Sequence, residues 1–361
     1  MSLDITNPEV RVLVVDDSAF MRTALSRMIE SEPGFTVAGT ACSGAAALAR
    51  IETLDPDVVS LDMEMPGLSG LETLRLIMAQ SPRPVIVVSA VTEKDAEATF
   101  DALSAGAFDY VPKHLSSTSL DILHIRDDLI AKIQAAALSR NSRSIDAPVK
   151  RPPRASGPDC PSFAFSAPAI VALGSSTGGP KALEQILTLL PQDLSVPILI
   201  VQHMPAGFTG PFAQRLNTMC RVAVREAAHR ELIRPGVVYI APAGTHMTVE
   251  RSSASRSNIC LDTHPEDSLH IPSVNVMMKS VADAFSNLAM GIILTGMGCD
   301  GAEGMQAIYR RGGFTVGQDE ASCTVYGMPR ACAELSILSR VVPLSQIPAV
   351  ILQATRYRKR A

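Results

Sequence analysis

The first third of the chain alternates short β-branched runs with stretches of helical pattern. These stretches are long enough for crossover helices, which is typical of parallel strands joined by helices. Five strands are expected, at residues 10–15, 36–40, 58–61, 85–89 and 107–111. The pattern between Val10 and about Ile133 therefore predicts an α/β domain with a doubly wound parallel sheet.

A segment without a sustained apolar period follows this domain. Arg, Ser and Pro accumulate in residues 139–168, most densely in residues 151–158, a composition typical of a linker. The alternation then resumes, with strands expected at residues 170–173, 198–202, 237–240, 291–294 and 314–316. We predict two doubly wound α/β domains, residues 1–135 and 167–361, joined by a linker at residues 136–166.

Composition narrows the class of protein further. The chain of 361 residues, 47% apolar and 19% charged, is long enough for two globular cores. A net charge of −4 argues against nucleic-acid binding, although residues 356–360 are basic. Seven cysteines without a CxxC pair favour the cytoplasm. No secretion signal or membrane-length apolar run is present, so we expect no membrane insertion.

Carboxylates gather at one predicted edge of the first sheet. Asp16 and Asp17 directly follow the first strand, and Asp62 ends the third. The carboxyl ends of parallel strands meet at one edge, so these side chains should crowd together. Such crowding is unfavourable unless a hard cation lies between the oxygens, which predicts a Mg²⁺ site.

Two further side chains are expected at the same edge. Ser89 ends the fourth strand and Lys113 follows the fifth, so a hydroxyl and an ammonium group could contact a phosphoryl group on Asp62. Each residue alone is more often a loop-end cap or a solvated charge. Their convergence with the carboxylates predicts a phospho-acceptor site.

These residues resemble the receiver domain of response regulators. The resemblance rests on the segments 14–18 (VVDDS), 61–66 (LDMEMP), 89–90 (SA) and 109–113 (DYVPK). It implies a flavodoxin-like fold, phosphorylation of Asp62 by a histidine kinase and phosphate sensing by Ser89 and Lys113. It also implies Mg²⁺ bound by Asp16, Asp17, Asp62 and the backbone carbonyl of Glu64. In one departure, His114 follows Lys113, where receivers usually have a cis proline.

The second domain contains a glycine-rich turn after its first strand. Residues 174–178 (GSSTG) match G-x-S-x-G, which presents a serine on a sharp turn between strand and helix. Ser176 is then the indicated nucleophile, and amides at the start of the helix could bind an oxyanion. A turn that caps a helix or cradles a nucleotide phosphate remains an alternative.

A histidine and an aspartate follow other strands of this domain. His203 comes directly after residues 198–202, and Asp300 lies in the loop at 295–301. A Ser, His and Asp at the carboxyl edge of one sheet predict a hydrolase triad of Ser176, His203 and Asp300. His246 is a reserve candidate for the base. The chain order Ser, His, Asp disfavours the α/β-hydrolase fold, which runs Ser, acid, His.

The second domain resembles the catalytic domain of chemotaxis methylesterases. The matching segments are 174–179 (GSSTGG), 202–209 (QHMPAGFT), 239–242 (YIAP), 294–302 (LTGMGCDGA) and 325–330 (VYGMPR). With the receiver, the resemblance covers nearly the whole chain. It implies a Rossmann-like fold and the triad of Ser176, His203 and Asp300. Ser176 is preferred over Ser175 because it directly precedes Thr177-Gly178-Gly179.

The resemblance also implies an activity and partners. These are hydrolysis of glutamate methyl esters and deamidation of glutamines on methyl-accepting chemoreceptors, without a cofactor for the esterase step, by a cytoplasmic monomer. The unphosphorylated receiver would cover the catalytic face. Departures are Cys299, where Asn is usual, and His229-Arg230, where Asp-Gly is frequent.

Two other classes of protein are alternatives for the second domain. One is a nonenzymatic nucleotide-binding module, in which the glycine-rich turn holds phosphate and His203 and Asp300 are structural. The other is a transcription factor, which the lack of a basic recognition helix disfavours.

Overall fold

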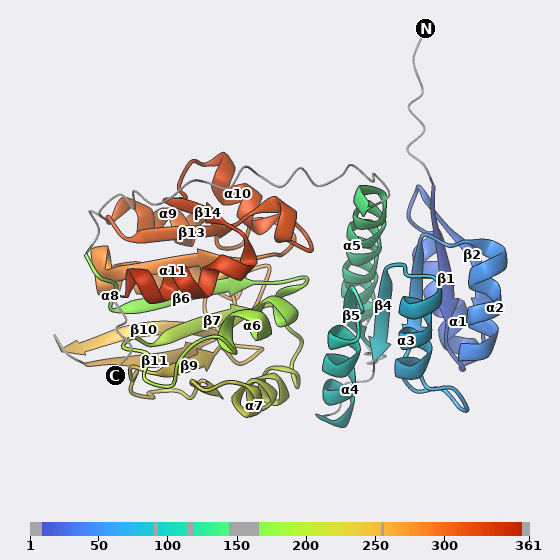
Figure 1. Ribbon diagram of the computed structural model, residues 1–361, viewed down its shortest axis with the longest axis horizontal. Helices are drawn as coiled ribbons and strands as arrows, with labels where there is room; N and C mark the ends of the chain where they lie inside the picture. Colours follow the sequence, from blue (N-terminus) through green and yellow to red (C-terminus); the bar gives the residue numbers. More distant parts are fainter. Residues whose placement is uncertain (1–8, 90–92, 114–118, 144–165, 254–255, 356–361) are drawn as a thin grey trace, which may run out of the picture. The chain divides into compact units, whose positions relative to one another are not determined.

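The computed structural model describes residues 9–89, 93–113, 119–143, 166–253 and 256–355. The chain forms two compact units, divided between Arg151 and Pro152. Both are α/β units built on a parallel sheet, as predicted (Figure 1). No helix in the described ranges is long and apolar enough to cross a membrane.

The first unit has a five-stranded parallel sheet in the order β2-β1-β3-β4-β5. Its strands are β1 (Val10–Val15), β2 (Phe35–Ala41), β3 (Val58–Asp62), β4 (Val85–Ser89) and β5 (Asp109–Pro112). Its helices are α1 (Ala19–Glu30), α2 (Gly44–Leu54), α3 (Gly70–Gln80), α4 (Glu93–Ser104) and α5 (Ser119–Arg143). All five predicted strands are present, with ends shifted by at most two residues.

The core of the first unit follows from strands that are apolar on both faces. β3 and β4 are buried throughout, because α1 and α5 cover one face of the sheet while α2, α3 and α4 pack in sequence on the other. Val12 and Val14 of β1 pack with Leu25 of α1 and Ile133 of α5. This two-sided cover explains why the strands read as continuous β-branched runs.

α5 continues past the predicted domain boundary at residue 135. It runs to Arg143, because Ala136 and Ala137 are buried in the core beside Ile133. The Arg140 guanidinium also donates to the Pro56 carbonyl at 2.7 Å and to an Asp57 carboxylate oxygen at 3.1 Å. The boundary at 135 was therefore set too early, since helix with tertiary contacts occupies residues 136–143. The predicted linker residues 144–165 lie outside the described ranges.

The second unit has a seven-stranded parallel sheet in the order β14-β13-β12-β6-β7-β9-β8, and a separate antiparallel hairpin of β10 and β11. The strands are β6 (Ile170–Ser175), β7 (Ile198–Gln202), β8 (Ala223–Glu226), β9 (Val237–Ile240), β10 (His246–Ser253), β11 (Arg256–Asp262), β12 (Ala289–Ile293), β13 (Phe314–Gln318) and β14 (Arg340–Val342). The helices are α6 (Gly179–Leu187), α7 (Thr209–Met219), α8 (Val274–Phe285), α9 (Ala302–Arg310), α10 (Met328–Glu334) and α11 (Ile347–Ala354).

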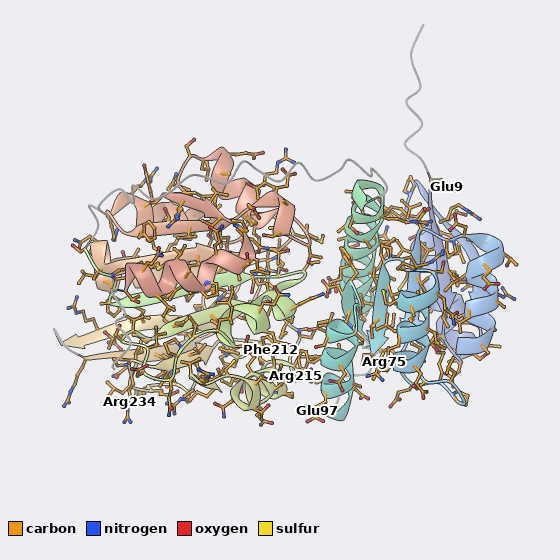
Figure 2. The ribbon with its side chains drawn as sticks, viewed as in Figure 1. Glu9, Arg75, Glu97, Phe212, Arg215 and Arg234 are labelled. Carbon is orange, nitrogen blue, oxygen red and sulfur yellow. The ribbon has the colours of Figure 1, made fainter. Side chains whose placement is uncertain are left out.

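The central strands of this unit were predicted, but the edge strands and the hairpin were not. β8 is mostly exposed and β14 has three residues, so neither shows the apolar run of a buried strand. The hairpin packs Met247, Val249 and Ile259 against α8. Along α7, Phe212 and Leu216 are buried, and Figure 2 labels Phe212 on this helix. The helices and the hairpin thus cover a sheet whose middle strands, β6, β7 and β12, are fully buried.

The strand order of the second sheet reverses next to β6. β6 pairs with β7 on one side and with β12 on the other. The chain builds the sheet outward from β6 to β8 and then returns to β12. Such a switch point opens a crevice beyond the carboxyl ends of the strands, where α/β proteins place their sites. The residues that follow β6, β7 and β12 are therefore the first to consider.

Candidate active site

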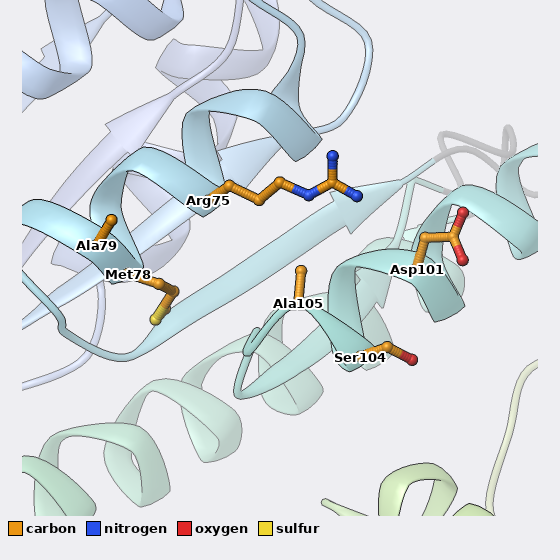
Figure 3. A pocket seen from close by; sticks show the side chains of 6 residues that line it. All are labelled: Arg75, Met78, Ala79, Asp101, Ser104 and Ala105. Atoms are coloured by element: carbon orange, nitrogen blue, oxygen red, sulfur yellow. The ribbon is translucent and has the colours of Figure 1, made fainter.

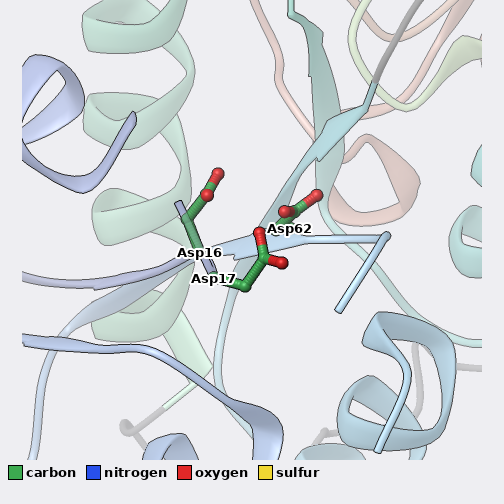
Figure 4. Close-up of side chains that lie close together, drawn as sticks. All are labelled: Asp16, Asp17 and Asp62. Carbon is green, nitrogen blue, oxygen red and sulfur yellow. The ribbon is translucent and has the colours of Figure 1, made fainter. Parts of the chain in front are cut away.

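The structure brings the three predicted carboxylates of the first unit together (Figure 4). One oxygen from each of Asp16, Asp17 and Asp62 lies within 4.8 Å of the others. Asp16 and Asp62 are buried, whereas Asp17 is exposed. The cluster forms because β1 and β3 are neighbours in the sheet and end at the same edge.

Lys113 is the counter-charge of this cluster. Its ammonium nitrogen lies 2.7 Å from Oδ1 of Asp62 and 3.0 Å from Oδ2 of Asp16. Burial alone would lower the pKa of Lys113, but hydrogen bonds and charge from the two carboxylates outweigh it and raise the pKa. The Lys113 amide donates to the carbonyl of buried Ser89 at 2.6 Å, so both predicted phosphate-sensing residues lie beside the cluster. His114 lies outside the described ranges.

The cluster has the chemistry of a hard-cation site. Three carboxylates face one ammonium, which leaves an excess of negative charge. Burial raises the pKa of Asp62, and Asp16 adds to the shift, while Lys113 and the Glu64 amide oppose it. Oδ2 of Asp62 is buried without a hydrogen-bond partner among the described residues. A divalent cation would offset the excess negative charge and give the unpaired carboxylate oxygen a partner, and Mg²⁺ prefers such oxygen ligands.

A shallow groove of about 570 Å³ lies elsewhere on the first unit, between α3 and α4 (Figure 3). It is lined by Arg75, Met78, Ala79, Asp101, Ser104 and Ala105. None of the predicted site residues lines it, and most of its lining side chains are exposed. It therefore plays no part in the sites argued here.

In the second unit, two adjacent serines lie where β6 ends: Ser175 is the last residue of the strand, and Ser176 begins the turn to α6. Ser175 is fully buried, and its hydroxyl donates to Oε1 of Gln202 at 2.7 Å. Ser176 is half-buried, and its hydroxyl has no partner among the described residues. Gly178 makes the turn possible, because its φ of 75° lies in the left-handed region that favours glycine. Ser176 is thus the serine presented at the sheet edge.

Gln202 holds this turn against the next strand. Its side-chain amide donates to the carbonyls of Ser176 and His203, both at 3.0 Å, while its oxygen accepts from Ser175. Gln202 is 2% exposed, so its own amide is shielded from water. One buried side chain therefore fixes the backbone of both Ser176 and His203.

Replacing Gln202 by leucine should lower the free energy of unfolding by about 3 kcal/mol, because buried polar groups would lose their partners. Urea unfolding of the Gln202→Leu variant, which carries an apolar side chain of similar size, measures this. Gln214→Leu, an exposed position on α7, is the control and should change stability by less than about 0.5 kcal/mol. A Gln202→Leu variant as stable as the wild type would show that the network contributes nothing.

His203 lies beside this turn and faces Asp300. Its backbone amide donates to the Ser175 carbonyl at 3.1 Å, so it extends the pairing of β6 with β7. Its ring Nε2 is 2.8 Å from Oδ2 of Asp300. Nδ1 is buried without a hydrogen-bond partner among the described residues. With Nε2 engaged by the carboxylate, Nδ1 is the nitrogen left for Ser176, the reverse of the chymotrypsin-type arrangement.

Asp300 is held at the N-terminus of α8. Oδ1 accepts from the Ser273 hydroxyl at 2.9 Å and the Asn275 amide at 3.0 Å, and Oδ2 accepts from the Val274 amide at 2.7 Å. Burial alone would raise the pKa of Asp300, but His203 and these donors outweigh it and hold the pKa well below its usual range. The carboxylate is therefore fixed in position and ionised.

The sequence indicated Asp300 but not the groups that hold it. Ser273 is the N-cap of α8, and its side chain also accepts from the Val276 amide. A serine before a run of apolar residues at helical spacing is a recognisable helix start. Nothing in the sequence pattern, however, indicates that residues 273–275 contact the loop after β12, which carries Asp300.

His246 has a structural role rather than that of a reserve base. It is fully buried, its Nδ1 accepts from the Ser273 amide at 3.1 Å, and its Nε2 lies 3.2 Å from the Pro265 carbonyl. Both ring nitrogens are therefore engaged. The departures noted in the sequence leave Asp300 in place, since Cys299 is exposed and the partners of Asp300 come from α8 and His203.

Backbone amides at the start of α6 could receive an oxyanion. The Gly179 amide is engaged, because it donates to the Ser176 carbonyl at 2.7 Å. The amides of Thr177 and Gly178 have no acceptor among the described residues. They lie at a helix N-terminus, where backbone dipoles favour negative charge. Among the amides at the start of this helix, those of Thr177 and Gly178 are therefore better placed than that of Gly179 to donate to an oxyanion.

Comparisons with known proteins agree with both halves of this description. Residues 171–351 match the model of the CheB methylesterase family, and residues 12–123 match that of the response regulator receiver domain. The chain is 45% identical to a protein-glutamate methylesterase/protein-glutamine glutaminase of Nitratidesulfovibrio vulgaris, over 95% of this chain and 98% of that protein. A relative of the same name from Oleidesulfovibrio alaskensis is 44% identical over 96% and 99% of the two chains.

A solved structure resembles the second unit. It is the methylesterase catalytic domain of Thermotoga maritima CheB, with a TM-score of 0.50 and 34% identity, and the match covers 52% of this chain and 99% of that domain. The output half of the chain thus matches a hydrolase domain, and neither of the two rival classes weighed from the sequence is supported.

Proposed function

The chain belongs to the CheB methylesterase family and carries a response regulator receiver domain, and on this basis we propose that it is a phosphorylation-activated hydrolase of glutamate methyl esters on chemoreceptors. The observation that supports this most is the hydrogen bond between His203 and Asp300, beside a sheet edge where Ser176 and His203 follow the paired strands β6 and β7. The proposed setting is the cytoplasm, where the cytoplasmic parts of methyl-accepting chemoreceptors are the substrate and a histidine kinase is the phosphate donor.

The proposed first step is acyl transfer to Ser176. Nδ1 of His203 takes the hydroxyl proton as Oγ of Ser176 bonds to the ester carbonyl carbon. The carbonyl oxygen becomes an oxyanion near the Thr177 and Gly178 amides, and each well-placed donor is worth about 3 kcal/mol in comparable sites. The bond to the methoxy oxygen then breaks, and the proton on His203 passes to the leaving group, which departs as methanol.

The second step returns the enzyme to its starting state. A water molecule gives a proton to His203 and attacks the acyl carbon, the bond to Ser176 breaks, and the proton returns to Oγ. The product is a glutamate carboxylate. A glutamine side chain can follow the same path, with ammonia in place of methanol as the leaving group. We therefore propose both esterase and glutaminase activity, consistent with the double name of the relatives.

Asp300 supports both steps without touching the substrate. Its bond to Nε2 fixes the ring orientation and stabilises the imidazolium that forms during each proton transfer. Burial alone would raise the pKa of Asp300, but His203 and the backbone amides of Asn275 and Val274 together hold that pKa below its usual range, so Asp300 stays ionised while His203 is protonated. The positive charge therefore rests on the imidazole.

The receiver supplies control in this proposal. A histidine kinase or a small phosphodonor phosphorylates Asp62, and this raises the hydrolytic activity. The side chains of Asp16, Asp17 and Asp62 and the backbone carbonyl of Glu64 would hold Mg²⁺, which when bound neutralises charge on the carboxylates and the phosphoryl group. Lys113 and Ser89 would then contact the phosphoryl oxygens.

Asp62→Asn should abolish activation by acetyl phosphate with Mg²⁺, because the amide cannot accept the phosphoryl group, while basal hydrolysis stays within about twofold of the wild type. Methanol release with and without phosphodonor measures both. Glu52→Gln, an exposed acid-to-amide change on α2, is the control and should be activated normally. Equal activation of the Asp62→Asn variant would remove the phospho-acceptor role.

A further inference from the structure

A second histidine lies flat against His203. The ring centroids of His203 and His270 are 4.0 Å apart, with 25° between the ring planes. His270 comes from the segment between β11 and α8, three residues before the N-cap Ser273 that binds Asp300. The sequence did not single it out, and the proposed acyl transfer uses no group on it.

The segment that carries His270 is anchored at several points. Near its start, the Pro265 carbonyl meets Nε2 of His246 at 3.2 Å, and at its end the Ser273 amide donates to Nδ1 of the same ring at 3.1 Å. Between them, the Ile271 carbonyl accepts from the Gly244 amide at 3.2 Å. His246 thus clamps both ends of the segment, and His270 is presented from a fixed support.

His203 needs such a support for a geometric reason. Its one ring hydrogen bond, from Nε2 to Asp300, fixes a point but leaves the ring free to tilt about that contact. Nδ1, on the other side of the ring, would swing most. A flat neighbour 4.0 Å from the ring face restricts that tilt. Misplacing a reacting group by about 1 Å can cost about 100-fold in rate.

We propose that His270 is a positioning residue: its ring packs against the imidazole of His203 and keeps Nδ1 directed at Ser176. This rests on the proposed function, because it assigns the base role to His203. The contact is made between the faces of the two flat rings. An aromatic replacement should therefore preserve it, and an aliphatic one should not.

The test compares His270→Leu with His270→Phe in the full-length protein, using methanol release from a glutamate methyl ester peptide. The leucine variant should lose at least about tenfold in kcat with KM within about twofold, and the phenylalanine variant should recover kcat to within about threefold of the wild type. The rate of serine labelling by a fluorophosphonate should follow kcat. If the leucine variant does not fold, His270→Gln takes its place and should show the same loss.

The matched control is His264→Ala, an exposed imidazole in the same segment whose side chain is 73% exposed. It should leave kcat unchanged. Wild-type kcat in His270→Leu, or a phenylalanine variant as slow as the leucine variant, would overturn the positioning role. Equal loss in the His264→Ala variant would also overturn it, because the effect would then belong to the segment as a whole. Failure of the proposed function itself would show separately, as unchanged hydrolysis in a Ser176→Ala variant.

Discussion

Ser176→Ala should reduce methanol release from a methylated receptor peptide by about 10⁵-fold to 10⁶-fold, the loss seen when a serine hydrolase loses its nucleophile. The reason is that Ser176 carries the hydroxyl proposed to attack the ester carbonyl. Ser175 is buried and its hydroxyl is bonded to Gln202, whereas the Ser176 hydroxyl has no partner among the described residues. The residual rate would come from binding and oxyanion stabilisation alone.

The neighbouring serine provides the control for this experiment. Ser175→Ala removes a hydroxyl from the adjacent position and should cost no more than about tenfold in kcat, together with about 1 kcal/mol of stability from the lost hydrogen bond. If Ser176→Ala kept the wild-type rate, or if Ser175→Ala lost as much, the nucleophile would be assigned to the wrong residue.

Asp300→Asn should reduce kcat by about 10⁴-fold, as for the corresponding change in a serine protease triad. The asparagine amide can still occupy the site. Its NH₂ group, however, is a donor and would face the Ser273, Val274 and Asn275 donors that now bind the carboxylate. It also supplies no charge to stabilise the imidazolium. Steady-state kinetics should show the loss in kcat, with KM little changed.

The control is Asp283→Asn, an exposed position at the other end of α8, which should keep the wild-type rate. A rate of Asp300→Asn within tenfold of the wild type would contradict the role of Asp300.

The lowered pKa of Asp300 also predicts a pH dependence of stability. An unfolded aspartate has a pKa of about 3.9, and the folded value is lower. The folded state therefore binds the proton less tightly, and Asp300 stabilises the fold above about pH 5. The stabilisation falls as the pH drops through the unfolded and then the folded pKa. The difference in unfolding free energy between wild type and Asp300→Asn, from urea titrations, should shrink from pH 6 toward pH 3. A constant difference would contradict the shift.

Both units place their predicted site residues by the same rule, and this explains why the sequence could group those residues. In a parallel sheet, all strands end at one edge. A polar residue directly after an apolar run can thus be assigned to that edge without knowledge of the strand order. Asp16, Asp62, Ser176 and His203 all meet this condition.

The groups that support the site could not be found in this way. Ser273 and His270 contact Asp300 and His203, respectively, from a segment that joins a hairpin to a helix. The hairpin packs on α8 rather than in the main sheet, so strand counting did not indicate it. The contact between the α8 N-terminus and the loop after β12 depends on helix packing, on which the apolar pattern carries no information. The extension of α5 to Arg143 was not predicted either. An arginine near Ser and Pro is typical of a linker, and only the folded structure shows the contacts of Arg140 with Pro56 and Asp57.

The central claim is that Ser176 is the one serine activated by His203. Labelling the full-length protein with a fluorophosphonate, which modifies activated serine hydroxyls, and mapping the adduct by peptide mass spectrometry tests it most directly. We predict one adduct, on Ser176, that forms in the wild type and is lost in His203→Gln. An adduct on Ser175, or labelling of Ser176 that continues at the wild-type rate without His203, would contradict it.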